Sequence, residues 1–175
     1  MAVSEIAQGF PPIADSAATI LVLGSMPGAE SLRQNAYYAH PRNAFWPIMG
    51  RLLGFDPAAT YVERTAALTH AGVALWDVLR ACERSGSLDA RIIDASIVVN
   101  DFAKFFQRHP RIDRVFFNGA RADQEFRRRV LPLLPARGEA LALHRLPSTS
   151  PALAQLSFEQ KLAAWRTLSA SLKRP

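Results

Sequence analysis

Short apolar runs alternate along this chain with longer segments whose apolar residues have helical spacing. Four runs, rich in β-branched or aromatic residues and bounded by turns, predict buried strands at residues 19–23, 73–76, 115–117 and 141–146. The spacing elsewhere predicts helices over residues 45–53 (with a start within 43–45), 61–70, 97–109, 120–134 and 158–172. This alternation is typical of an α/β fold with a parallel sheet covered on both faces.

The residues that directly follow the four predicted strands are glycines, prolines, amides, one acid and small hydroxyl residues. They are residues 24–28, Asp77, Asn118 with Gly119, and residues 147–151. Because open parallel sheets bind ligands beyond the carboxyl ends of their strands, these four segments predict one shared site. Residues 35–46 add aromatic rings, amides and basic groups to the first segment. Stacking surfaces beside planar hydrogen-bonding groups favour a nucleobase over a metal ion or a fatty acid.

The composition predicts a globular protein with one domain over residues 1–175. About half of the residues are apolar (49%) and only 21% are charged, which is unlike a disordered chain. The net charge of +6 favours a polyanionic partner, because it creates an attractive potential for phosphates. Many basic proteins bind no nucleic acid, so the charge alone does not decide this.

Cys82 is the only cysteine, which excludes disulfides within the chain, cysteine-based zinc sites and iron–sulfur clusters. The first fifteen residues lack the basic start and apolar core of a signal peptide. No apolar run approaches the roughly 20 residues that a membrane-spanning helix needs. We therefore expect a cytoplasmic protein without a membrane partner.

Three segments carry a family resemblance: GSMPG at residues 24–28, YYAHPRNAFW at residues 37–46 and LPSTSP at residues 146–151. Together they resemble the uracil-DNA glycosylase superfamily. Within it, the chain is most similar to the hypoxanthine (deoxyinosine) DNA glycosylases, which are related to the mismatch-specific uracil-DNA glycosylases. The resemblance implies a three-layer α/β/α sandwich around a four-stranded parallel sheet.

The resemblance also implies an activity, namely hydrolysis of the N-glycosidic bond of a deaminated base that has been flipped out of DNA. Hypoxanthine in deoxyinosine is the expected base, and the product is an abasic site. The enzyme would be monofunctional, with no Schiff-base lysine, since none of the three lysines lies in the candidate segments. The resemblance implies DNA with deaminated bases as the partner, no metal or organic cofactor, and no obligate protein partner.

Two positions depart from the family pattern. Met26 stands where relatives carry an Asn or Asp that positions water, and Leu146 stands where they carry a His or Asn that stabilises the leaving base. These departures leave open a DNA-lesion-binding protein without catalysis. A uracil or mismatch specificity also stays open, because the choice of base depends on pocket geometry, and a hydrolase of a free nucleotide or small phosphate ester is the third alternative.

Asn43 is the predicted catalytic residue, because its amide can replace the missing water-positioning group. The competing interpretation is a helix cap, since Asn is favoured just before a helix. Tyr38 is predicted to stack on the flipped base, a contact that contributes about 1–3 kcal/mol in nucleic-acid complexes. A packing role is its alternative.

Further candidates come from the same segments. Ser25, Met26, His40, Asp77 and Asn118 are predicted to line the base-binding pocket together with Tyr38. For His40 a structural hydrogen bond is an equal alternative. For Asp77 the alternative is a helix cap, and for Asn118 with Gly119 it is a turn.

Contacts with the DNA backbone are predicted for Arg42, Arg145, Ser148, Thr149 and Ser150. The alternative for Arg42 is a solvated surface arginine. For Ser148, Thr149 and Ser150 the alternative is a loop that caps the last helix. The run of arginines at residues 127–129 is interpreted as a solvated helix face.

Overall fold

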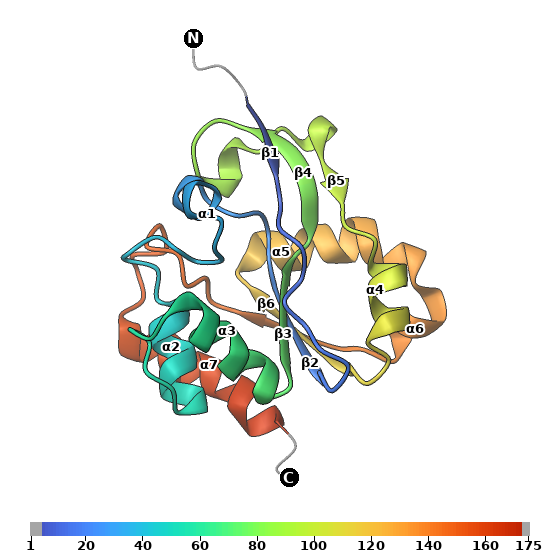
Figure 1. Cartoon of the computed structure of the whole chain (residues 1–175). Coiled ribbons are helices and arrows are strands. Elements are labelled where there is room, and N and C mark those ends of the chain that lie inside the picture. Colours follow the sequence, from blue (N-terminus) through green and yellow to red (C-terminus); the bar gives the residue numbers. More distant parts are fainter. Residues whose placement is uncertain (1–4, 173–175) are drawn as a thin grey trace.

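The computed structural model describes residues 5–172, and its centre is a four-stranded, all-parallel sheet (Figure 1). Its strands are β2 (Ile20–Gly24), β3 (Val73–Asp77), β6 (Arg114–Asn118) and β7 (Ala142–Leu146), in the order β3-β2-β6-β7. β2 pairs with a strand on each side, and all five of its residues are buried. Fully buried apolar strands are what helices on both faces of a parallel sheet require. The predicted fold class is confirmed.

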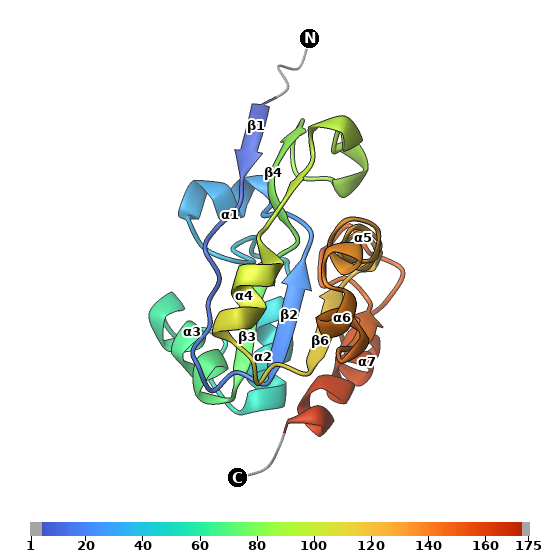
Figure 2. The same cartoon turned by 90° about the vertical axis from the view of Figure 1, so that its right-hand side faces the viewer.

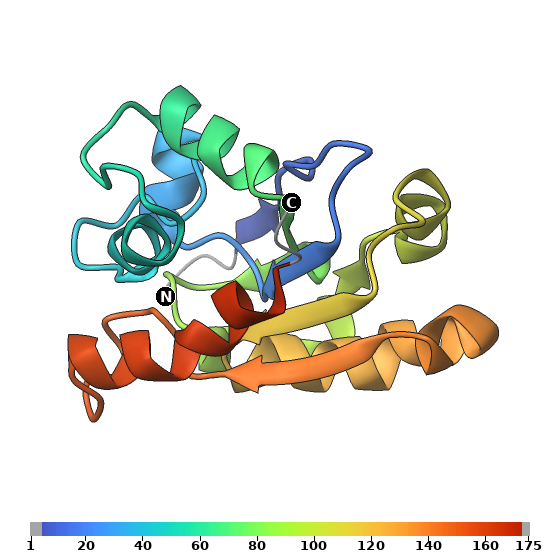
Figure 3. The ribbon, with the colours of Figure 1, turned by 90° about the horizontal axis from the view of Figure 1, so that it is seen from below.

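Helices cover both faces of this sheet. One layer consists of α2 (Phe45–Leu53), α3 (Tyr61–His70) and α7 (Phe158–Ser171). The other consists of α4 (Phe102–Arg108), α5 (Ala120–Glu125) and α6 (Pro135–Glu139). The two groups lie on opposite sides of the strands in Figures 1 and 3, which gives the three layers.

A second, antiparallel sheet was not predicted. Its strands are β1 (Glu5–Gln8), β4 (Leu79–Arg84) and β5 (Val98–Val99), in the order β1-β4-β5. Figure 2 shows β1 and β4 beyond the end toward which the arrow of β2 points, near the short helix α1 (Ala29–Gln34). The second sheet therefore lies at the edge of the central sheet where the ligand site is expected.

Two predicted helices are wrong in part. The helix predicted over residues 97–109 begins only at Phe102, because Val98 and Val99 pair with β4 and the side chain of Asp101 caps α4 by accepting the Lys104 N–H. The helix predicted over residues 120–134 changes geometry on the way. α5 continues as a π-helical turn (Phe126–Val130) and ends in a 3₁₀ turn (Leu131–Leu133) that contains a proline.

Two buried tryptophans tie the helical layer to segments of the expected site. Trp165 of α7 donates its indole N–H to the carbonyl of Pro147 at 2.9 Å. Trp46 of α2 donates in the same way to the carbonyl of Tyr37 at 2.8 Å. Each bond satisfies a polar group that burial would otherwise leave unpaired. The loops that begin at Tyr37 and Pro147 are thereby fixed to the core.

Among the described residues, no helix combines the length and apolar character needed to cross a membrane.

The start of α3 gives a prediction of stability. Thr60 accepts the N–H of Glu63, whose carboxylate binds the Thr60 N–H in return. Substitution of such a capping Thr by Ala removes a bond to an otherwise unpaired helix N–H and costs about 1 kcal/mol. We expect Thr60→Ala to lower the free energy of unfolding in urea by about this amount. Thr65→Ala, at a partly buried position inside the same helix, is the control, and equal losses in the two variants would contradict the capping role.

Candidate active site

A cavity of about 730 Å³ opens at the carboxyl ends of the central strands, within the range of about 300–1,000 Å³ that is usual for ligand sites. Its wall combines the turn after β2, the segment before α2, the ends of β3 and β6, and the loop after β7. Almost all predicted site residues line it, namely Ser25, Met26, Tyr38, His40, Arg42, Asn43, Asp77, Asn118, Ser148, Thr149 and Ser150. The structure thus brings together four segments that are far apart in the sequence.

Arg145 is the one candidate that the structure does not bring to the cavity. Its guanidinium group binds the carboxylate of Asp123 on α5 at 2.6 Å, and it is absent from the cavity wall. The neighbouring arginines of α5 and its π-helical turn are also paired. Arg127 binds Asp123, and Arg129 binds Glu125, both at 2.6 Å. Arg127 and Arg128 are exposed, as expected of a solvated helix face, and the structure adds that the run is also paired with carboxylates.

The floor of the cavity depends on the missing side chain of Gly24. A Cβ atom at this position would lie 2.4 Å from Asp77 Oδ1 and 2.8 Å from the Tyr38 hydroxyl. Both distances are shorter than real Cβ contacts, so only glycine lets these two groups approach the end of β2. Tyr38 Oη and Asp77 Oδ2 are both buried, and within residues 5–172 neither has a hydrogen bond of standard geometry. Unpaired buried polar atoms are costly, and a pair of them in a cavity wall is typical of a site that a ligand completes.

The Asp77 carboxyl group is only 3% exposed. Burial raises its pKa to about 7, the nearby Asp89 carboxylate raises it too, and Arg84 opposes both. The backbone carbonyl of Asp77 accepts a bond from Asn100 Nδ2 at 2.8 Å, which fixes the end of β3. Near neutral pH this side chain is thus present in substantial amounts both as a hydrogen-bond donor and as a carboxylate.

Tyr38 adopts a left-handed backbone conformation (φ +54°), which is uncommon for a residue with a bulky side chain. Its ring stacks on Phe45 with 4.1 Å between the ring centroids and 26° between the planes. One face of the ring is therefore covered by the core. A base can stack only on the other face, so Phe45 serves as the backing of a stacking surface. Strained residues of this kind cluster at functional sites.

Asn43 bonds to the start of α2 and also lines the cavity. The N-cap position is held by Ala44, whose side chain cannot cap, and Asn43 Oδ1 takes this role by accepting the N–H of Phe45, the first residue of α2, at 2.9 Å. This bond fixes the direction of the side chain, which lines the cavity and is only partly buried. An amide oxygen has a second lone pair, and the amide nitrogen makes no bond in the described structure. The capping role and a water-positioning role are therefore compatible.

Asn118 and Thr149 form a clamp between β6 and the loop after β7. Asn118 Oδ1 accepts the Thr149 N–H, and Asn118 Nδ2 donates to Thr149 Oγ1, both at 2.9 Å. The carbonyl of Thr149 accepts the N–H of Ala44 at 3.0 Å. Because both polar atoms of Asn118 are used within the protein, this residue positions the loop and the neighbouring Asn43. The expected cap of the last helix is provided by Ser157 instead.

His40 and Arg42 lie on the outer part of the wall. His40 Nδ1 accepts the backbone N–H of Arg42 at 3.1 Å, so its proton lies on Nε2 in the neutral ring. The Arg42 side chain is exposed at the cavity. An unburied guanidinium group at the mouth of a cavity is well placed to contact a phosphate.

Lys161 comes closer to the site than the sequence suggested. This buried residue of α7 donates its ammonium group to the carbonyl of Ser150 at 3.1 Å. Burial lowers its pKa. The bond fixes the loop after β7, and Lys161 itself does not line the cavity.

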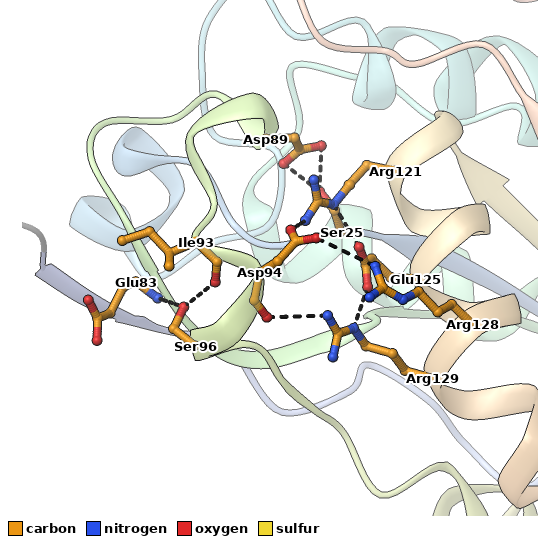
Figure 4. Close-up of polar contacts among 10 residues, drawn as sticks. All are labelled: Ser25, Glu83, Asp89, Ile93, Asp94, Ser96, Arg121, Glu125, Arg128 and Arg129. Atoms are coloured by element: carbon orange, nitrogen blue, oxygen red, sulfur yellow. Dashed lines mark hydrogen bonds and ion pairs between the residues drawn. The ribbon is translucent and has the colours of Figure 1, made fainter.

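The main residue that sequence analysis missed is Asp89. It lies in the loop between β4 and β5, residues 85–97, which we call the rim loop. Both oxygens of its carboxylate are 2.8 Å from the Ser25 hydroxyl, which donates to them (Figure 4). Burial raises the pKa of Asp89, whereas the Ser25 hydroxyl, Arg84 and Arg121 oppose this change. No local pattern in the sequence marks this position, because its role depends on the second sheet.

Polar contacts hold the rim loop against α5 (Figure 4). Asp94 binds Arg121 at 2.7 Å and Arg128 at 3.5 Å, and its carbonyl accepts a bond from Arg129 at 3.2 Å. At the other end of the loop, the Ser87 hydroxyl accepts the Ala29 N–H at 2.8 Å. The position of Asp89 is therefore fixed from two directions.

Comparison with known proteins agrees with this geometry. The family model for the uracil DNA glycosylase superfamily matches residues 11–169. The chain belongs to the uracil DNA glycosylase superfamily. The predicted family and a DNA glycosylase of the kind that repairs deaminated bases are thereby confirmed, and DNA is the substrate.

Individual relatives of this superfamily cover most of the chain. A "Hypoxanthine DNA glycosylase" of Methanosarcina barkeri is 40% identical over 118 residues, which are 67% of this chain and 73% of the relative. A protein of the same name from Methanosarcina acetivorans is 37% identical over 148 residues, which are 84% and 88% of the two chains. A solution NMR structure of a Methanosarcina acetivorans protein superimposes with a TM-score of 0.75 at 34% identity, over 94% of this chain and 99% of the other.

The raised pKa of Asp77 predicts a pH-dependent stability. Between about pH 4 and pH 7 the unfolded chain loses the Asp77 proton and the folded protein retains it, so this group makes the folded state less stable as the pH rises. The amide in Asp77→Asn does not titrate. We expect the free energy of unfolding of Asp77→Asn, relative to the wild type, to rise by about 1.4 kcal/mol per pH unit in this window. Urea unfolding at pH 5, 6 and 7 measures it, and a constant difference would contradict the raised pKa.

The Asn118–Thr149 clamp gives a second prediction. Thr149→Val keeps the shape of the side chain but leaves Asn118 Nδ2 buried without a partner, which costs about 1–3 kcal/mol. We expect a loss of this size in the free energy of unfolding. Thr167→Val, at an exposed position of α7, is the control. A loss in Thr149→Val no larger than in the control would show that the clamp contributes nothing.

Proposed function

We propose that this protein is a monofunctional DNA glycosylase that releases hypoxanthine from deoxyinosine and leaves an abasic site. The observation that carries the proposal is the convergence of Tyr38, Asn43 and Asp77 on one cavity in a member of this superfamily. Hypoxanthine is the preferred base because two relatives at 40% and 37% identity bear that name. A DNA substrate accords with the cytoplasmic location expected from the sequence.

The cavity residues divide the reaction between them. When the glycosidic bond breaks, the sugar becomes cationic and the departing base anionic, and water adds to the anomeric carbon. In our proposal Asn43 positions this water with the free capacity of its amide. Tyr38 stacks on the flipped base with the ring face that Phe45 leaves open. The unpaired groups of Tyr38 and Asp77 meet the polar edge of the base.

Hypoxanthine matches the floor of the cavity in its hydrogen-bonding groups. It presents a carbonyl oxygen and ring nitrogens that accept bonds, and one ring N–H that donates. A protonated Asp77 and the Tyr38 hydroxyl are both donors, and each also has a lone pair. Arg42, Ser148 and Ser150 at the mouth provide the backbone contacts in this proposal.

The test is base release from labelled duplexes that contain one deoxyinosine or one deoxyuridine, followed by alkali to cleave abasic sites. No metal is added. We expect release from the inosine duplex, and a loss of at least about 100-fold in Asn43→Ala, because a misplaced nucleophile costs this much. Gln107→Ala, an exposed amide on α4 outside the cavity, is the matched control and should act like the wild type. Borohydride should trap no covalent complex with DNA.

Each outcome distinguishes the alternatives. Faster release from the uracil duplex would keep the superfamily and change the base. Tight binding of either lesion without release would favour a lesion-binding protein. Full activity in Asn43→Ala would leave the enzyme and remove that residue from the mechanism. A trapped complex that disappears in Lys161→Arg would overturn the monofunctional assignment.

A further inference from the structure

The cavity contains few side chains that can accept a proton from water. The candidates are Glu30, His40, Asp77 and Asp89. Glu30 is bound to Arg33 and Gln34, and the hydrogen bond from Arg33 above all lowers its pKa to about 2, so it is a weak base. His40 already uses Nδ1 to accept the Arg42 N–H. Met26, beside Ser25, has no group that can take a proton. The two aspartates remain.

Asp77 and Asp89 share the cavity but differ in environment. Asp77 is buried on the floor, and no residue in the described part of the chain donates to its Oδ2. Asp89 is only partly buried, and both of its oxygens receive the Ser25 hydroxyl. Burial raises the pKa of both carboxyl groups, but at Asp89 the Ser25 hydroxyl, Arg84 and Arg121 oppose this rise, whereas at Asp77 only Arg84 does. Two carboxyl groups kept in different protonation states in one site are a recurrent solution for acid and base roles.

The reaction requires this asymmetry. A carboxylate beside the departing anionic base would repel it, whereas a neutral carboxyl there can donate a proton. A carboxylate beside the cationic sugar would stabilise it. The deeper position of Asp77 therefore suits the base, and the outer position of Asp89 suits the sugar and the water.

We propose that Asp89 is a catalytic residue whose carboxylate faces the sugar and accepts the proton of the attacking water, while the Asp77 carboxyl donates a proton to the departing base. This proposal rests on the glycosylase function proposed above. The water oxygen bonds to C1′, and the C1′–N9 bond breaks with both electrons passing to the base. One water proton moves to Asp89, and the Asp77 proton moves to N7 of the base. Exchange with solvent restores both groups.

The rim loop supports this role mechanically. Asp94, on the same loop, is held by Arg121, Arg128 and Arg129 (Figure 4). Buried Arg84 of β4 joins the loop to the turn after β2, since it donates to the carbonyls of Gly86 and Pro27. A carboxylate that accepts a proton from one water molecule benefits from such fixed placement, because small displacements cost large factors in rate.

The charged and titratable groups around the two carboxyls determine the pH profile. Burial raises the pKa of both carboxyl groups. Asp89 and Arg84 also act on the pKa of Asp77, and Ser25, Arg84 and Arg121 act on the pKa of Asp89. Tyr37 and Tyr38 stay neutral because burial raises the pKa of both phenols. We expect a bell-shaped dependence of base release on pH. Its acid limb reports the loss of the Asp89 carboxylate, and its alkaline limb, near pH 7, the loss of the Asp77 proton.

The experiment compares Asp89→Asn with Asp94→Asn in single-turnover base release from the inosine duplex. Both variants change a carboxylate of the rim loop to an amide, so the second is the matched control for loosening of the loop. We expect Asp89→Asn to lose about 100-fold or more in rate and to lack the acid limb. Asp94→Asn should lose less than about tenfold and retain the limb. Formate should restore release in Asp89→Ala, since it supplies the missing carboxylate.

The outcomes separate this proposal from the function on which it rests. A wild type that releases no base overturns both. An active wild type with equal rates in the two Asn variants, or no rescue by formate, overturns the role of Asp89 alone. Should Asp89→Asn fail to fold by circular dichroism, Asp89→Glu provides the readout. It keeps the carboxylate and should retain the acid limb, and its absence would contradict the proposal.

Discussion

The site depends on the absence of a side chain at Gly24. This residue ends β2, the strand that pairs with β3 on one side and β6 on the other, and Gly24 itself is paired with Asp77 of β3. The space that a Cβ would take is occupied by the Asp77 carboxyl and the Tyr38 hydroxyl. A side chain here would push both groups out of the cavity floor. The positions of the two groups that are proposed to meet the polar edge of the base depend on this close approach.

The second sheet supplies the part of the site that the central sheet cannot. Parallel strands bring their carboxyl ends to one edge, which accounts for Asp77, Asn118 and the turn at Gly24. β4 leaves that edge directly after β3, and the rim loop behind it returns to the cavity with Asp89. The two carboxyl groups thus reach the same cavity from one continuous segment of the chain, and they differ in environment because Asp77 is buried and Asp89 lies at the rim.

Local patterns predicted the central sheet well and the second sheet not at all. Strands that consist of a fully apolar run, such as β2, can be predicted from the sequence, because both of their faces are buried. β4 has the sequence LRACER, where exposed and buried positions are mixed with charges, and β5 has two residues. Such strands form only when a partner lies beside them. The same reason explains the candidate site: Tyr38, Asn43 and Asp77 follow elements that the sequence reveals, whereas Asp89 requires knowledge of which loops meet.

The paired arginines near α5 change what the net charge of the protein means for its encounter with DNA. Four arginines are paired with carboxylates of this chain: Asp123 binds Arg127 and Arg145, and Glu125 binds Arg121 and Arg129. The counterions released when a duplex binds are set by the phosphates that the protein neutralises. Arginines that keep their own carboxylates contribute little to this release. The salt dependence of binding is therefore set by which cations lie against the duplex, such as exposed Arg42 at the cavity, and cannot be read from the net charge of +6, which already subtracts the carboxylates.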